Sequence, residues 1–193
     1  MDALGGIFTA FGLSASAGLN AYIPLLVISL LARFTDLIKL NSPWDTLESP
    51  WIIGLLVVLI LIEFFADKVP AVNHVNDLIQ TFVRPVAGAL LFAASAKVVT
   101  DVHPIISLGA GLLVAGSVHA VKSLAIRPAV TATTAGAGNV PVSMLEDFIS
   151  GIVSILSIII PVLFAMIVII FTSWVVWKMW YRTGVKRTAE SID

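Results

Sequence analysis

The sequence predicts an all-α protein that crosses a membrane several times. Of its 193 residues, 59% are hydrophobic and only 12% are charged, whereas a soluble domain carries about 25% charged residues. The apolar residues gather in runs of about 20, the length that an α-helix needs to cross the hydrocarbon core. A transmembrane barrel would show alternating segments of about ten residues instead, and the sequence contains none. We therefore expect one transmembrane domain over residues 1–193.

Five apolar segments follow one another along the chain. They cover residues 5–34, 51–66, 85–100, 104–125 and 148–181. As straight helices of ~1.5 Å per residue, the first and the last would measure roughly 45–50 Å, against a hydrocarbon core of ~30 Å. Each of these two overlong segments contains a proline, Pro24 or Pro161, so we expect a break, a kink or a strong tilt in both.

The centre of the first segment, GLSASAGLNAYIP at residues 12–24, is rich in Gly, Ser and Asn. One interpretation is close packing, because small residues four apart let helix backbones approach each other. The other is a broken helix whose freed backbone groups and half-helix ends bind a solute near the membrane midplane. Under the second interpretation the candidate solute-binding residues are Ser14, Ser16, Gly18, Asn20 and His119.

Two polar stretches separate the later apolar segments. In VPAVNHVNDLIQTFVRP the apolar residues recur with helical spacing, which predicts an amphipathic helix over residues 70–83, at the interface or packed on the bundle. The second stretch, TATTAGAGNVPVSMLED, covers residues 131–147 and has few charges. We expect an irregular loop that folds back into the protein, since backbone at membrane depth must be buried or line a cavity.

Weak internal similarity suggests an inverted repeat. Residues 12–24 align with residues 111–123, and residues 51–59 align with residues 148–156, at offsets of 99 and 97. The predicted halves, 5–66 and 104–181, are joined by the helix 70–83 and the span 85–100. Three crossings separate the copies, so the copies point in opposite directions, as in many secondary transporters.

Charged residues near the segment ends form a second candidate site. Because Glu63 and Asp67 lie four residues apart on one helix face, they would repel each other without nearby cations. We expect a charged vestibule at one mouth of a pathway, or a structural ion-pair network at the interface. Its members are Glu63, Asp67, Lys68, Asp77, Arg84, Lys122 and Arg127.

Two further positional predictions concern charged residues. Arg84 and Arg127 each precede a proline, so each should lie at a helix junction and pair with a carboxylate of Glu63, Asp67 or Asp77. Glu146 and Asp147 precede the last apolar segment. We expect their negative charges to stabilise the N-terminus of that helix through the helix dipole.

Basic residues predict the orientation. The tail carries four cations and an aromatic belt precedes it, which places the C-terminus in the cytoplasm and, with five crossings, the N-terminus outside. The predicted cytoplasmic set is Arg33, Lys39, Lys97, Lys178, Arg182, Lys186 and Arg187. The four cations predicted outside, Lys68, Arg84, Lys122 and Arg127, oppose the positive-inside rule.

Several kinds of chemistry find no support in the sequence. The chain has no cysteine, which excludes disulfides and thiolate metal sites. His74 and Asp77 have a spacing that suits a metal ligand pair, but with three histidines in all we expect neither a metal nor a cofactor. No phosphate-binding loop, G-x-S-x-G or H-E-x-x-H motif is present, so we predict no catalytic residue and no nucleic-acid partner.

Three stretches carry a family resemblance: GLNAYIPLL, EFFADKVPAVNHVNDLIQTFVRPVAGALL and ATTAGAGNVPVSMLED. They resemble a family of small bacterial integral membrane proteins that is catalogued as a domain of unknown function, number 4126. The resemblance runs from about residue 4 to residue 180, and the middle stretch is the most specific. It implies a protein of the bacterial inner membrane and brings no activity or site residue.

Three functional hypotheses follow. The first is a small transporter or channel for an unidentified small solute, with membrane lipids as its surroundings and a homo-oligomer as one compatible assembly. The second is a scaffold or assembly subunit whose small-residue ridges bind partner helices. The third is a membrane-embedded lipid-modifying enzyme, and its only candidate cluster is Glu63, Asp67, His74 and Asp77.

Overall fold

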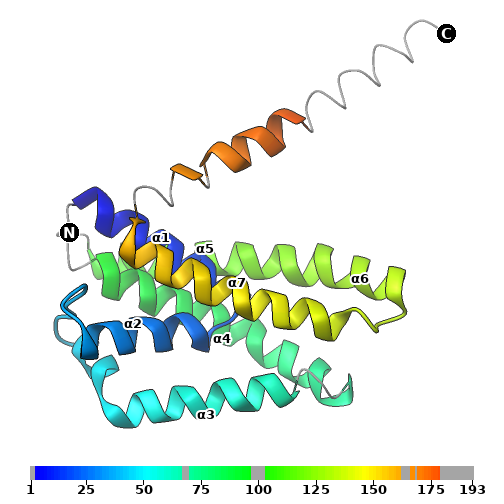
Figure 1. The fold of residues 1–193 in the computed structure, drawn as a ribbon, viewed down its shortest axis with the longest axis horizontal. Helices are drawn as coiled ribbons and strands as arrows, with labels where there is room; N and C mark the ends of the chain where they lie inside the picture. The colour runs from blue at the N-terminus through cyan, green and yellow to red at the C-terminus, as the bar shows by residue number, and fades with distance from the viewer. Residues whose placement is uncertain (1–2, 67–69, 97–102, 162–165, 168, 179–193) are drawn as a thin grey trace, which may run out of the picture.

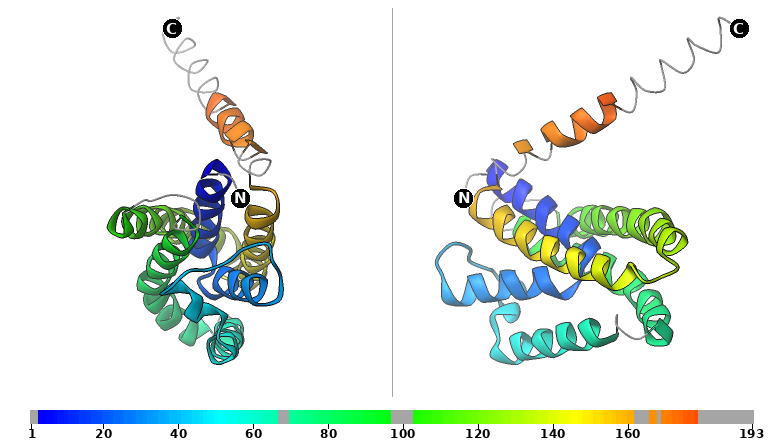
Figure 2. Two further views of the ribbon diagram at one scale, coloured as in Figure 1. Left: turned by 90° about the vertical axis from the view of Figure 1, so that its left-hand side faces the viewer. Right: turned by 45° about the vertical axis from the view of Figure 1, so that its right-hand side comes forward.

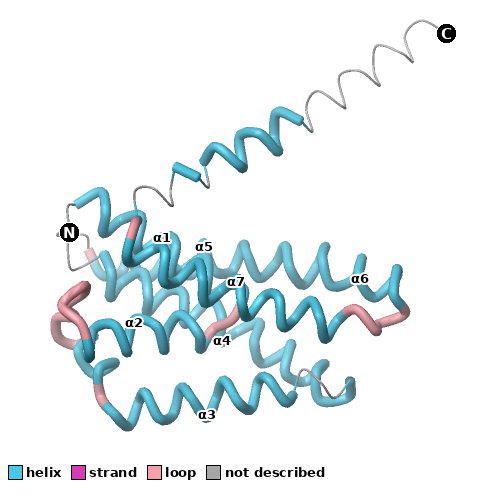
Figure 3. The backbone as a smooth tube through the Cα atoms, viewed as in Figure 1, coloured by secondary structure: helices cyan, strands magenta, loops and turns pink. Residues whose placement is uncertain are grey.

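A computed structural model describes residues 3–66, 70–96, 103–161, 166–167 and 169–178, with side chains at all of these except 3–4, 70–75, 77 and 96. The described part is helical and contains no strand, which confirms the all-α class (Figure 1, Figure 3). Three helices of this described part are long and apolar enough to cross a membrane. They cover Leu78–Ser95, Pro104–Thr134 and Asn139–Ile159. The chain is therefore a membrane protein, and its other apolar helices are shorter.

The first apolar segment is broken, as one of the two interpretations predicts. Helix α1 covers Ala3–Leu19 and helix α2 covers Tyr22–Phe34. The two helices run in opposite directions, so the start of α1 and the end of α2 lie at the same end of the bundle (Figure 1, Figure 2). Pro24 lies in the first turn of α2, where a missing N–H costs little. The overlong segment is thus a helical hairpin and does not cross from end to end.

The next two helices return along the bundle. A short 3₁₀ turn, η1 (Trp44–Glu48), leads into α3 (Pro50–Ala66), and α4 follows over Pro70–Ala96. Helix α4 continues through Pro85, which contradicts both the separate helix 70–83 and the junction predicted at Arg84. A proline inside a helix of a membrane bundle is tolerated because neighbouring groups satisfy the freed backbone.

The prediction of an irregular loop that folds back into the protein at residues 131–147 is wrong. Helix α5 (Pro104–Val121), a π-helical turn η2 (Lys122–Ile126) and α6 (Arg127–Thr134) form one helical stretch of 31 residues. Four residues then turn the chain into α7 (Asn139–Ile159). The turn is tight because Gly136 adopts a φ of +88° and the Gly138 N–H donates to Thr134 Oγ1 at 2.9 Å.

The last apolar segment is interrupted near its proline. Helix α7 ends at Ile159, two residues before Pro161, and a further apolar helix covers Ile169–Lys178. In Figure 1 this further helix extends away from the bundle. The two overlong segments are therefore both interrupted, but only the first folds back as a hairpin inside the bundle.

Small residues bring α1, α4 and α5 into direct backbone contact, which we call the glycine contact. A Cβ atom on Gly88 would lie 2.2 Å from the Cβ of Ala115, and one on Gly111 would lie 2.4 Å from the carbonyl oxygen of Gly88. On Gly18 it would lie 2.6 Å from the carbonyl oxygen of Ala115. Ser14 adds a hydrogen bond from its Oγ to the Gly111 carbonyl at 2.8 Å. The packing interpretation of the small residues therefore holds for this face of α1.

Hydroxyl groups join another face of α1 to α7, and we call this contact the hydroxyl seam. The Oγ atom of Ser16 lies 2.8 Å from Ser150 Oγ and 2.7 Å from Ser154 Oγ. Further along, Thr9 Oγ1 donates to the Ser157 carbonyl at 2.7 Å. All five residues are buried. Because residue 9 faces residue 157 and residue 16 faces residue 150, α1 and α7 are antiparallel.

Candidate functional site

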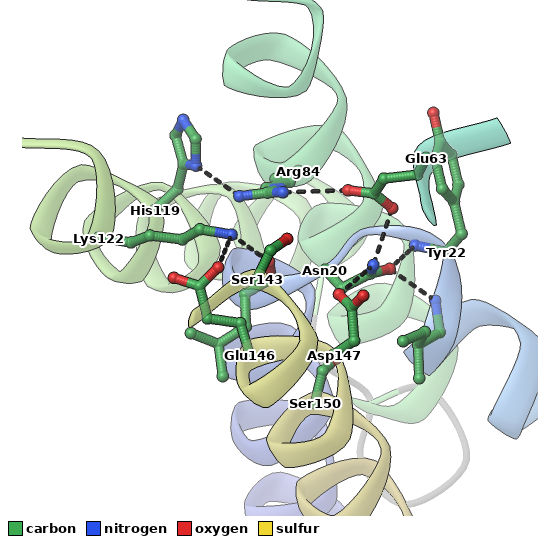
Figure 4. Close-up of polar contacts among 12 residues, drawn as sticks. Asn20, Tyr22, Glu63, Arg84, His119, Lys122, Ser143, Glu146, Asp147 and Ser150 are labelled. Atoms are coloured by element: carbon green, nitrogen blue, oxygen red, sulfur yellow. Dashed lines mark hydrogen bonds and ion pairs between the residues drawn. The ribbon is translucent and has the colours of Figure 1, made fainter. Parts of the chain in front are cut away.

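Charged side chains surround the break between α1 and α2 (Figure 4). The break lies deep in the bundle rather than at its surface, since Asn20 and Ala21 are at most 1% exposed. Its depth can be read from the 31-residue stretch Pro104–Thr134, in which His119 is the sixteenth residue. The site is therefore about halfway along the longest helical stretch among the described residues.

Asn20 shapes the break and connects it to two other helices. Its Oδ1 accepts hydrogen bonds from the backbone N–H groups of Tyr22 at 2.9 Å and Ile23 at 3.0 Å, which caps the start of α2. Its Nδ2 donates to Glu63 Oε2 at 2.8 Å and to Asp147 Oδ1 at 2.9 Å. One amide therefore ends a helix, starts another, and links α3 to α7.

An ion pair and a histidine extend the site across α3, α4 and α5. Arg84 Nη2 lies 3.0 Å from Glu63 Oε1, and both side chains are almost fully buried. Arg84 Nη1 contacts His119 Nδ1 at 3.3 Å, and His119 Nε2 contacts Thr81 Oγ1 at 3.2 Å. The predicted pairing of Arg84 with Glu63 is confirmed, although in mid-helix.

A second group of charges lies where α5 and η2 meet α7. Glu146 Oε2 lies 2.7 Å from Lys122 Nζ and 3.2 Å from Arg127 Nη2. Lys122 Nζ also donates to the carbonyl of Leu19 at 2.9 Å, at the C-terminal end of α1. A cation there suits the negative end of the helix dipole. Arg127 thus pairs with Glu146, an acid that the prediction did not include, because the long α5–α6 stretch carries it towards α7.

Among the described residues, the charges of this cluster balance. Three cations, Arg84, Lys122 and Arg127, face three carboxylates, and we call the set with Asn20 and His119 the charged cluster. The carboxylates belong to Glu63, Glu146 and Asp147. Burying unpaired charge is very costly, so the balance is a condition for placing six ionisable groups here. Ionisable groups inside a membrane bundle mark candidate functional sites.

The charged cluster changes two sequence predictions. Glu146 and Asp147 are the eighth and ninth residues of α7, about two turns from its N-terminus, so the predicted capping role is wrong. The charges also lie inside the bundle and not at a mouth. Of the predicted vestibule, Glu63, Arg84 and Lys122 are at most 3% exposed.

The other members of the predicted sites either are outside the described residues or belong to helix contacts. Asp67 and Lys68 are outside the described residues, as is the side chain of Asp77. Ser14, Ser16 and Gly18 lie in the helix contacts of α1, between two and six residues before Asn20. Asn20 and His119 do belong to the charged cluster. Glu63 and Arg84 join these two side chains, because Asn20 bonds to Glu63, Glu63 to Arg84, and Arg84 to His119.

Sequence reasoning missed the roles of Glu146, Asp147 and Ser143. A signal for them exists, since Ser143, Glu146 and Ser150 recur with helical spacing and form one polar stripe on α7. Within the described residues, no group of three His, Cys, Asp or Glu side chains is arranged to hold a metal ion.

The chain matches the family described as Domain of unknown function (DUF4126) over residues 7–181. This match covers most of the sequence and agrees with the resemblance of the three quoted stretches. No curated protein and no solved structure matches the chain.

Proposed function

This chain belongs to the family described as a domain of unknown function (DUF4126), and from that premise we propose that it transports a small polar or charged solute across the membrane. The observation that carries the proposal is the break at Asn20, where two half-helix ends meet balanced buried charges halfway along the bundle. Discontinuous helices with binding sites near the midplane are typical of secondary transporters.

The half-helix ends give the proposed site both polarities. The C-terminal end of α1 carries partial negative charge and contacts the ammonium group of Lys122. The N-terminal end of α2 carries partial positive charge, and Asn20 holds the carboxylates of Glu63 and Asp147 close to it. A polar solute that enters the site can exchange hydrogen bonds with these groups. Helix packing alone does not require these charged groups, since a protein with well-packed apolar side chains in place of a buried ion pair is often as stable.

The two other hypotheses have less support. A scaffold that binds partner helices needs exposed small-residue ridges, whereas the ridge of Ser107, Gly111 and Ala115 on α5 is buried within this chain. A lipid-modifying enzyme needs a free catalytic acid. Glu63, the described member of that candidate cluster, is already engaged by Arg84 and Asn20.

Location and orientation remain part of the proposal. We place the protein in the inner membrane of a bacterium, with a cytoplasmic C-terminus. Three of the four cations that opposed the positive-inside rule, Arg84, Lys122 and Arg127, are buried or nearly buried in the charged cluster. Buried cations carry no information on orientation, so the main objection to the proposed orientation disappears.

The test is transport by the purified protein in liposomes, using a panel of small ions, organic acids, amines and neutral osmolytes. We expect at least one solute to cross faster than in protein-free liposomes. Lys122→Gln should remove most of this flux, because it deletes a charge at the break while Glu146 keeps Arg127 as a partner. The matched control is Lys39→Gln, an exposed lysine in the loop after α2.

Two results would contradict the proposal. One is a flux of every solute in the panel that equals the flux of protein-free liposomes. The other is a solute flux that Lys122→Gln leaves as high as Lys39→Gln does, since transport would then bypass the charged cluster.

A further inference from the structure

The contact between Arg84 and His119 defines the protonation state of the histidine. A guanidinium group has hydrogen-bond donors and no acceptor. The contact of Arg84 Nη1 with His119 Nδ1, at 3.3 Å, is therefore a hydrogen bond only if Nδ1 carries no proton. His119 is then a neutral imidazole with its proton on Nε2, which donates to Thr81 Oγ1 at 3.2 Å.

A proton added at Nδ1 would oppose this contact directly. Two N–H groups would face each other, and two positive charges would lie within hydrogen-bond distance. Lys122, three residues along the same helix, adds positive charge, while the carboxylates of Glu63 on α3 and of Glu146 and Asp147 on α7 bond to other members of the charged cluster. The bond from Nε2 to Thr81 is unaffected.

Arg84 is the residue that this repulsion would move. It extends from α4, pairs with Glu63 on α3 and contacts His119 on α5, so it joins three helices at one point. Apart from Leu56, Glu63 is the one residue of α3 that is buried. A displaced Arg84 would therefore loosen α3 from the bundle beside the break at Asn20.

We infer that His119 is the binding site of a coupling proton, and that protonation of its Nδ1 expels Arg84 and opens the charged cluster. The inference rests on the proposed transport function and assigns its coupling ion. The step is balanced: neutral imidazole takes one proton from water and becomes imidazolium, with N–H groups at both ring nitrogens. Deprotonation restores the Arg84 contact and closes the cluster.

The first test reads the tautomer of His119 in the wild-type protein by ¹⁵N NMR of histidine-labelled protein in nanodiscs. At about pH 8 we expect the neutral Nε2–H tautomer, and on acidification the imidazolium form. A proton on Nδ1 of the neutral ring would overturn the inference. This measurement needs no substitution in the charged cluster, so it does not depend on a variant that folds.

The second test measures opening by the distance between spin labels on cysteines introduced into this cysteine-free chain. Leu61→Cys on α3 and Leu113→Cys on α5 are both exposed positions. We expect the distance to increase on acidification, in step with the imidazolium signal. His119→Asn keeps a neutral acceptor and takes no proton, so its distance should stay at the high-pH value. His103→Asn, the same change at an exposed histidine on the same helix, should behave as wild type.

The outcomes separate this inference from the proposed function. A distance that ignores pH in the wild type, or that still changes in His119→Asn, overturns the proton site even if a solute crosses the membrane. A pH-dependent opening that His119→Asn abolishes supports the proton site, and the liposome experiment then decides independently whether the protein transports a solute.

Discussion

Helix α1 contains two regions of opposite character. At Ser14 and Gly18, the glycine contact holds it against α4 and α5 so closely that a methyl group added at Gly18 has no room. At its C-terminal end, the charged cluster surrounds a break whose partners are charges and hydrogen bonds. The backbone atoms of the glycine contact have no alternative partner, so this region is suited to stay fixed. The hydrogen bonds and ion pairs of the charged cluster can be exchanged for those of a solute, and they are suited to a site that opens and closes.

Breaking one ion pair of the charged cluster should have the largest effect on stability. Arg84→Met leaves the buried carboxylate of Glu63 without its cation, which costs about 3–5 kcal/mol of unfolding free energy. Denaturant titration of the protein in detergent micelles measures this loss. Arg33→Met, at an exposed arginine, should change the value by at most about 0.5 kcal/mol.

Removing the other charge as well should separate stability from function. Adding Glu63→Gln to Arg84→Met deletes the unpaired charge and keeps an acceptor for Asn20, so most of the lost stability should return. Solute flux should not return. If the double variant regains both its stability and its flux, the ion pair serves folding alone.

The glycine contact should lose stability when a side chain is enlarged, as a rigid region does. Gly111→Ala places a Cβ 2.4 Å from the Gly88 carbonyl oxygen, and overpacking of this kind costs about 3 kcal/mol. Gly109→Ala, two residues earlier on α5, meets nothing within 4 Å and should be neutral or slightly stabilising. Thermal unfolding midpoints of the two variants give the comparison, and equal midpoints would show that the close approach is not real.

The hydroxyl seam should give the smallest effect. Ser16→Ala removes the hydroxyl shared by Ser150 and Ser154, and hydrogen bonds between helices in membranes are worth about 1 kcal/mol each. Ser117→Ala, on an exposed face of α5, is the control and should cost less. If Ser16→Ala lowers the free energy of unfolding as much as Gly111→Ala does, α1 has no exchangeable contact with α7.

The sequence was most informative where local chemistry decides the structure. The break at Asn20 could be predicted because Gly, Ser and Asn weaken a helix locally and Pro24 suits a new first turn. The pairing of Arg84 with Glu63 could be predicted because few acids lie in the apolar segments, and a buried cation needs one.

Tertiary structure decided the rest. The Thr and Gly residues between 131 and 138 have weak helix propensity, yet α6 continues to Thr134, since packing and membrane depth favour a satisfied backbone. The partners of Arg127 and Asp147 depend on how α5, η2 and α7 approach each other around the break. No spacing within a single segment contains that information.

If the break at Asn20 is a transport site, reagents dissolved in water must reach it, and cysteine accessibility measures whether they do. Ala21→Cys places a thiol at the break, whereas Val121→Cys places one at a similar depth on the outer surface, where the residue is 59% exposed. Only a thiolate reacts, and a thiol in lipid stays protonated. With a charged, membrane-impermeant thiol reagent, the account predicts modification of Ala21→Cys and no modification of Val121→Cys. Two equally inert thiols would contradict it.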